Sequence, residues 1–155
     1  MAAEVRLGDA TITKLPQWAE QMNHTASGCR PDSELVSSID RGVYIAVFFL
    51  RSNRHITIGR LGRLFFERGL YFYVGSAQRN LQARLARHGR RRKARRWHID
   101  YLAANSVMIG ALVVLRGKQL ECQMARSLSE EYVCPHKGFG SSDCRCRSHL
   151  FYKRL

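Results

Sequence analysis

The sequence predicts an α+β fold of the general α/β type, in which a small, mostly antiparallel central sheet of three to four strands is flanked by helices. Uninterrupted apolar runs begin at Gly42, Gly69 and Val107, which is typical of buried strands. Other segments repeat apolar residues at helical spacing, as Leu81 and Leu85 do. The length of 155 residues suits one domain with a real core.

The first half of this domain is expected to consist of strands. Gly42–Arg51 is nearly all apolar, which predicts a strand covered on both faces. Arg54–Arg60 alternates polar and apolar residues and is predicted to be its antiparallel partner. Leu61–Phe66 is expected to continue that partner or to form an edge piece. After a turn, Leu70–Val74 is predicted to be the central strand.

The second half is expected to contain three helices and two further strands. The predicted elements in order are a helix from Asn80 to Gly89, a short helix Trp97–Ala104, a buried strand Val107–Leu115, a long helix Gln119–Tyr132, a loop Cys134–Arg147 and a closing strand Ser148–Tyr152.

Residues 1–40 form an acidic segment before the predicted domain at 41–155. They hold six acidic and three basic residues and only short apolar clusters. We interpret them as a weakly ordered N-terminal arm with one short helix near Glu34–Ile39. The alternative is that the arm packs on the domain as an extra layer.

Positive charge dominates the chain, with 26 lysines and arginines against 12 acidic residues, a net charge of +14 and a pI of about 10.4. The ten basic residues between Arg68 and Ile99 are accompanied by no acidic residue. This pattern predicts a nucleic-acid partner bound through its phosphates, although a merely solvated basic surface is the alternative. The candidate nucleic-acid contacts are Ser76, Arg79, Arg87, Arg90, Arg91, Arg92, Lys93, Arg95 and Arg96.

Several properties bear on location. No apolar run approaches the ~20 residues that cross a bilayer, and the first residues lack the pattern of a secretory signal. We therefore expect a cytoplasmic protein with no membrane partner.

Five cysteines, an odd number, favour free thiols or metal ligands over a disulfide framework.

A candidate site lies where the central strand passes into the following helix. Tyr71 and Tyr73 share one face of the strand, and Arg84 and His88 share one side of the helix. Hydroxyl groups and a cation can therefore converge at the junction.

Glu121 is the most informative carboxylate because it lies within an apolar stripe of the long helix. A carboxylate in that position is costly unless it pairs with a cation or a metal ion. A buried ion pair with an arginine and a metal site are equally compatible with this pattern.

The C-terminal loop contains sulfur and imidazole groups sufficient for one tetrahedral zinc ion. The candidate ligands are Cys134, Cys144, Cys146 and His149. Their irregular spacing, without a paired Cys-x-x-Cys, favours free cysteines over this zinc site. Cys122 is interpreted as a small buried apolar residue.

Two short motifs, Gly42-Val43-Tyr44 and Tyr73-Val74-Gly75, resemble the signature of the GIY-YIG nuclease superfamily. The segments Gly75–Ala77, Trp97–Leu102, Glu121-Cys122 and Gly138–Cys144, with Arg84 and His88, resemble a poorly characterised prokaryotic branch long catalogued as a domain of unknown function. The resemblance runs from Gly42 to the C-terminus. The interval between the two motifs is longer than usual, which predicts an insertion at Ile56–Phe66.

The resemblance implies a metal-dependent endonuclease that cleaves nucleic acid, with DNA expected and RNA as the alternative. It implies Glu121 as the ligand of a single Mg²⁺ or Mn²⁺ ion and Arg84 as the clamp on the scissile phosphate. Tyr44 would be the general base or orient the water, and Tyr73 would hold the nucleophile or a phosphate oxygen.

Two histidines complete the implied site. His88 would contact a phosphate or protonate the leaving oxygen, although a histidine that caps the helix is equally compatible. His98 and Asp100 enter through the motif alone, because residues two apart diverge on a helix. The rival function is a catalytically inactive nucleic-acid-binding module of the same fold.

Overall fold

The computed structural model describes residues 6–7, 10–11, 40–115 and 117–155, and the chain divides into two units, Met1–Val36 and Ser37–Leu155. In the first unit, strands β1 (Arg6–Leu7) and β2 (Ala10–Thr11) pair in antiparallel fashion. The helix predicted near Glu34–Ile39 lies outside the described residues.

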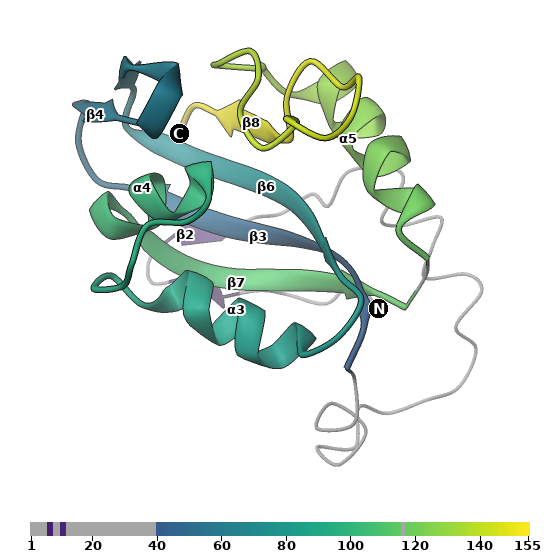
Figure 1. The fold of residues 1–155 in the computed structure, drawn as a ribbon. Coiled ribbons are helices and arrows are strands. Elements are labelled where there is room, and N and C mark those ends of the chain that lie inside the picture. Colours follow the sequence, from purple (N-terminus) through teal and green to yellow (C-terminus); the bar gives the residue numbers. More distant parts are fainter. Residues whose placement is uncertain (1–5, 8–9, 12–39, 116) are drawn as a thin grey trace. The chain divides into compact units, whose positions relative to one another are not determined.

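The second unit is built on a four-stranded sheet in the order β7-β3-β6-β8 (Figure 1). Its strands are β3 (Gly42–Leu50), β6 (Gly69–Ala77), β7 (Val107–Val114) and β8 (Leu150–Lys153). Every neighbouring pair is antiparallel. The predicted α+β class with a small antiparallel sheet is therefore confirmed.

The described part of the chain has three α-helices beside this sheet: α3 (Leu81–Gly89), α4 (His98–Asn105) and α5 (Gln119–Glu131). Among the described residues, no helix is both long and apolar enough to cross a membrane.

The two faces of the sheet carry different helices because side chains alternate along each strand. Tyr44, Phe48 and Tyr71 project to one face, where they join a buried cluster with Leu81 of α3 and Leu102 of α4. On the other face, the Phe72 ring contacts the ring of Tyr132, directly after α5. Met124, Ala125 and Leu128 form the buried stripe of α5, as the sequence predicts.

A small hairpin separates β3 from β6. Strand β4 (Arg54–Thr57) pairs with β5 (Arg63–Phe66), and a 3₁₀ turn at Gly59–Leu61 joins them. The segment between the two motif strands thus forms a hairpin of its own, and the prediction that Arg54–Arg60 pairs with the Gly42 strand is wrong. The physical reason is that β6 and β7 already occupy both hydrogen-bonding edges of β3.

Strand β7 differs from the prediction of a buried strand over Val107–Leu115. It lies at one edge of the sheet, and Gly110, Ala111 and Leu112 in its middle are exposed. An apolar run indicates that a strand forms, but it does not distinguish an edge strand from a central one.

Candidate functional site

A cleft of about 810 Å³ opens at the end of β6, and all six residues predicted to act in catalysis or metal binding line it. They are Tyr44, Tyr73, Arg84, His88, His98 and Glu121. Ser76, Arg79 and Arg96 from the predicted nucleic-acid contacts also line the cleft.

The cleft exists because β6 extends beyond its neighbour β8. Strand β8 pairs with Leu70–Tyr73 only, and the next contact on that edge is a hydrogen bond from the Val74 N–H to the carbonyl of His149, 2.9 Å. Beyond Val74, side chains from both faces of the sheet meet around the edge of β6. Tyr73 comes from the α3 face, whereas Ser76 points to the face that carries Glu121.

Tyr44 and His88 form a hydrogen-bonded pair at the base of the cleft. The Tyr44 hydroxyl lies 2.7 Å from Nε2 of His88, and both side chains are buried. The ring of Tyr73 meets the His88 ring edge to face, with centroids 5.9 Å apart. His88 lies in the last turn of α3, but its ring nitrogen contacts a tyrosine, so the helix-capping alternative is wrong.

Two glycines make room for the tyrosines. A Cβ added at Gly75 would lie 2.6 Å from the Tyr44 hydroxyl oxygen, and one at Gly140 would lie 2.8 Å from the Tyr73 ring. Such distances are shorter than van der Waals contact. The glycine of the Tyr73-Val74-Gly75 motif therefore lets the Tyr44 hydroxyl lie directly over β6.

The protonation states follow from burial. Burial raises the pKa of Tyr44, and the adjacent Arg84 guanidinium offsets part of that rise. Burial also raises the pKa of Tyr73, and the nearby Tyr44 and Glu121 raise it further. Burial and the nearby Lys93 ammonium lower the pKa of His88 to about 4, so its imidazole is neutral at pH 7.

Arg84 bridges the cleft to the edge of β6. Its Nη1 donates a hydrogen bond to the main-chain carbonyl of Ser76, 2.8 Å, and its guanidinium lies 5.0 Å from the centroid of the Trp97 ring. Arg87 contacts the same indole at 4.5 Å. Trp97 lines the cleft but was not predicted as a site residue; the motif that begins with it was the available signal.

Two predicted nucleic-acid contacts, Arg87 and Lys93, form ion pairs within the protein. Arg87 donates to both carboxylate oxygens of Asp100, at 2.6 and 3.0 Å, and the Lys93 ammonium lies 3.4 Å from that carboxylate. These two cations therefore pair with an acidic residue that lies just outside the acid-free run. Asp100 follows the run directly, and the start of α4 turns it back towards α3.

His98 and Asp100 diverge, as helical spacing predicts. His98 faces the cleft, where its Nδ1 accepts a hydrogen bond from the Gly140 N–H, 3.1 Å. The buried Asp100 side chain instead accepts from the N–H groups of Arg96 and Trp97, which fixes the first turn of α4. Asp100 therefore holds the helices together and does not line the cleft.

Glu121 reaches the cleft from α5 with two fixed contacts. The Ser76 hydroxyl donates to Oε2, and Nδ1 of His149 lies 3.0 Å from Oε1. Burial alone would raise the pKa of Glu121, but the contacts with His149 and Ser76 hold it below the ordinary value, so the group is a carboxylate at neutral pH. The arginine partner considered from the sequence is not among the described contacts of Glu121.

Sequence reasoning also missed several residues that line the cleft, including Lys118, Ser142 and Asp143. Lys118 and Asp143 form an exposed ion pair of 3.4 Å at the rim. Asp143 belongs to the Gly138–Cys144 motif, so the resemblance contained a signal for it. Lys118 lies at a turn and gave none.

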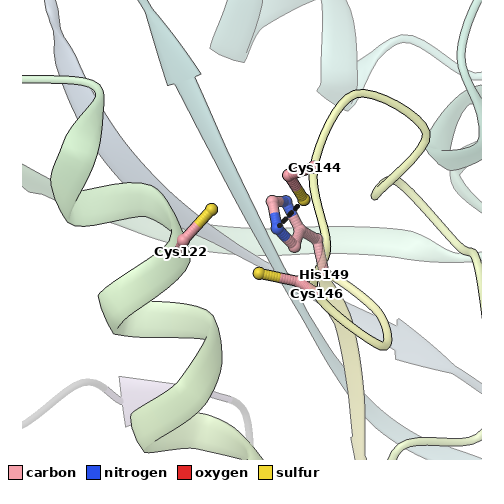
Figure 2. A group of neighbouring side chains, drawn as sticks. All are labelled: Cys122, Cys144, Cys146 and His149. Carbon is pink, nitrogen blue, oxygen red and sulfur yellow. Dashed lines mark hydrogen bonds between the residues drawn. The ribbon is translucent and has the colours of Figure 1, made fainter.

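A second group of side chains lies next to the cleft, on α5 and in the loop before β8. The metal-ligating atoms of Cys122, Cys144, Cys146 and His149 all lie within 4.8 Å of one another (Figure 2). Three sulfurs and an imidazole suit zinc better than magnesium or manganese. Two predictions are corrected here: Cys134 is not in this group, and Cys122 is not merely a small apolar residue.

The geometry explains why Cys122, and not Cys134, belongs to this group. Cys122 lies on the side of α5 that faces the loop, whereas the Cys134 thiol points to the carbonyl of His136, 3.8 Å away. Linear spacing in the tail cannot reveal a ligand contributed by a helix more than twenty residues earlier.

Comparison with known proteins identifies a family. No curated protein and no solved structure matches the chain. Residues 43–154 match the family described as Domain of unknown function DUF123. This match spans more than half of the chain and includes the whole cleft and the Cys/His group, so the protein belongs to the DUF123 family.

Proposed function

We propose that this protein is a metal-dependent endonuclease of the GIY-YIG type, which hydrolyses phosphodiester bonds with DNA as its expected substrate. The supporting observation is that one cleft collects two tyrosines, an arginine, a neutral histidine and a carboxylate. Phosphodiester hydrolysis needs a group that accepts the proton of water, cations near the phosphate and a site that neutralises developing charge.

In this proposal Tyr44 and His88 act together on the attacking water. A buried tyrosine with a raised pKa is a poor base by itself. Neutral His88 lies 2.7 Å from the hydroxyl and can accept the phenolic proton in concert with transfer of a proton from water to the Tyr44 oxygen. Because the pKa of His88 is lowered to about 4, the imidazole holds this proton only transiently. The pair then shares the work of one general base, and Tyr73 lines the same cleft to orient the nucleophile or a phosphate oxygen.

Arg84 is the proposed phosphate clamp. Its guanidinium is held between the Ser76 carbonyl and the Trp97 ring, which restricts its side chain before substrate binds. A fixed planar guanidinium is suited to bidentate recognition of a phosphate.

The residues present fit a single divalent ion. Mg²⁺ is commonly bound by one or two carboxylates together with water and substrate phosphates. Glu121 supplies one carboxylate in the cleft, and its Ser76 and His149 contacts leave further lone pairs of the two oxygens available. When bound there, Mg²⁺ or Mn²⁺ would lower the pKa of a water and neutralise charge on the phosphate.

The test is a cleavage assay with supercoiled, branched and single-stranded DNA and RNA, with and without Mg²⁺ or Mn²⁺. Tyr44→Phe should lower the metal-dependent rate by about a hundredfold or more, as expected for the loss of general-base assistance. Tyr71→Phe is the matched control, because the Tyr71 hydroxyl donates to the Glu67 carbonyl and does not line the cleft. Binding without cleavage of any substrate would instead support the inactive binding module.

A second prediction concerns salt dependence. Six arginines around α3 and the following loop are exposed and are the proposed phosphate contacts: Arg79, Arg90, Arg91, Arg92, Arg95 and Arg96. If all six engage, affinity should fall about a thousandfold between ~50 and ~200 mM salt. A double variant, Arg90→Gln with Arg92→Gln, should reduce the slope of log affinity against log salt by about 2.

The control for this titration is Arg63→Gln, on the β4–β5 hairpin and outside the cleft. Its slope should equal that of the unaltered protein. An affinity that hardly changes with salt would contradict phosphate binding by this surface.

A further inference from the structure

We propose that Cys122, Cys144, Cys146 and His149 together bind one structural zinc ion that fastens the C-terminal loop to α5. Cys122 comes from α5, and the other three come from the loop and the residue before β8 (Figure 2). The proposal concerns a separate ion from the divalent metal of the cleft.

The distances are close to those of a tetrahedral site. With Zn–S bonds of about 2.3 Å and a Zn–N bond of about 2.0 Å, sulfurs lie about 3.8 Å apart and sulfur and nitrogen about 3.5 Å apart. Nε2 of His149 already lies 3.4 Å from the Cys144 sulfur. The four ligand atoms lie within 4.8 Å of one another, so shifts of about 1 Å complete the tetrahedron.

The orientation of His149 matches that of a metal ligand. Its Nε2 faces the Cys144 sulfur, while Nδ1 on the other side of the ring lies 3.0 Å from Oε1 of Glu121. Histidines that bind a metal through one nitrogen usually present the other to a carboxylate or a carbonyl, which fixes the tautomer. The imidazole is buried, so this orientation is held by its surroundings.

The surroundings also supply compensating charge and access. Zinc with three thiolates and a neutral imidazole carries a net charge of −1. A second cavity, of about 320 Å³, is lined by Cys122 and Cys146 together with Arg126, Arg145 and Arg147. These arginines can offset the negative charge, and the cavity is a path by which the ion reaches the sulfurs.

The role of such an ion follows from the elements that it joins. The loop over 134–149 contains no helix or strand, and its closing contacts include the bond from the His149 N–H to the Phe139 carbonyl, 2.8 Å. A four-coordinate site with no open position adds a cross-link between this loop and α5. If the proposed nuclease function holds, the same ion keeps Glu121 in place through His149.

The experiment measures zinc in the untagged full-length protein by elemental analysis and examines its environment by X-ray absorption at the zinc edge. We expect about one ion per chain with three sulfur ligands and one nitrogen ligand. Substitution with Co²⁺ should give the thiolate charge-transfer and ligand-field bands of a tetrahedral site. A protein that retains no zinc after incubation with zinc and gel filtration, or zinc bound without sulfur, would overturn the proposal.

Variants then identify the ligands. Cys122→Ser should weaken zinc retention against a competing chelator by at least about a hundredfold. Cys134→Ser, the matched control outside the group, should retain zinc like the unaltered protein. Loss of zinc from Cys134→Ser with retention in Cys122→Ser would contradict the assignment.

If Cys122→Ser does not fold, the absorption spectrum of the unaltered protein still decides the ligand set. All these readouts concern zinc and not cleavage, so their failure is distinguishable from failure of the proposed nuclease function.

Discussion

Glu121→Gln is expected to reduce metal-dependent cleavage about a thousandfold while leaving nucleic-acid affinity within about twofold. The amide keeps the size of the side chain but loses the charge that the proposed Mg²⁺ or Mn²⁺ ion requires. Binding should persist because the proposed phosphate contacts come from the exposed arginines and not from Glu121. Single-turnover cleavage rates and a binding titration at the same salt concentration measure the two effects separately.

Glu130→Gln is the matched control for this variant. Glu130 lies on the same helix but is exposed and outside the cleft. Zinc content should be measured in each preparation, because His149 contacts Glu121 and a loss of zinc could itself lower the rate. A Glu121→Gln protein with full zinc and an unaltered cleavage rate would show that this carboxylate is structural only.

Asp100→Asn is expected to lower the free energy of unfolding by about 3 kcal/mol, because it leaves two cations without their counter-charge. The Asp100 side chain is fully buried, and the side chain of Lys93 is only 6% exposed. The substitution also weakens the hydrogen bonds that begin α4. Urea unfolding at neutral pH gives the difference directly.

The control is Asp143→Asn, which removes an ion pair whose two side chains are more than half exposed. Its effect should stay within about 0.5 kcal/mol, as is usual for surface pairs. Equal stability losses for the two variants would show that Asp100 contributes no more than a surface charge.

The pH dependence of stability provides a second test of Asp100. Burial alone would raise its pKa, but Arg87 and the main-chain donors lower it from 3.8 to about 2. Asp100 therefore stabilises the fold above pH 3.8 and loses this contribution as pH falls towards 2. The pKa of His88 is lowered from 6.5 to about 4, so protonation of His88 destabilises the folded state as the pH falls from 6.5 towards 4. Asp100→Asn should remove the lower part of the acid transition and retain the upper part.

The strands and helices could be predicted from the sequence because each has its own local pattern. The apolar runs at Gly42 and Gly69 and the stripe of α5 correspond to observed elements. The partner of β4 could not be predicted, since pairing depends on which edges are free in the folded sheet.

The site residues divide in the same way. Motif spacing and resemblance identified Tyr44, Tyr73 and Glu121, which line one cleft. Other contacts could not be predicted from the sequence. Asp100 neutralises Arg87 across two helices, and Cys122 joins cysteines more than twenty residues away. Such contacts arise from the packing of α3 on α4 and of α5 on the loop, and no local pattern records them.

The short stretch of β6 beyond β8 also bears on self-association. An unpaired strand edge offers main-chain groups to a strand of another molecule, which is a common route to aggregation. Here two of the outer groups have other partners: the Val74 N–H bonds to the His149 carbonyl, and the Ser76 carbonyl accepts from Arg84. A positively charged side chain thus occupies a main-chain acceptor at the place where the fold leaves the edge open, which hinders its pairing with a strand of another molecule.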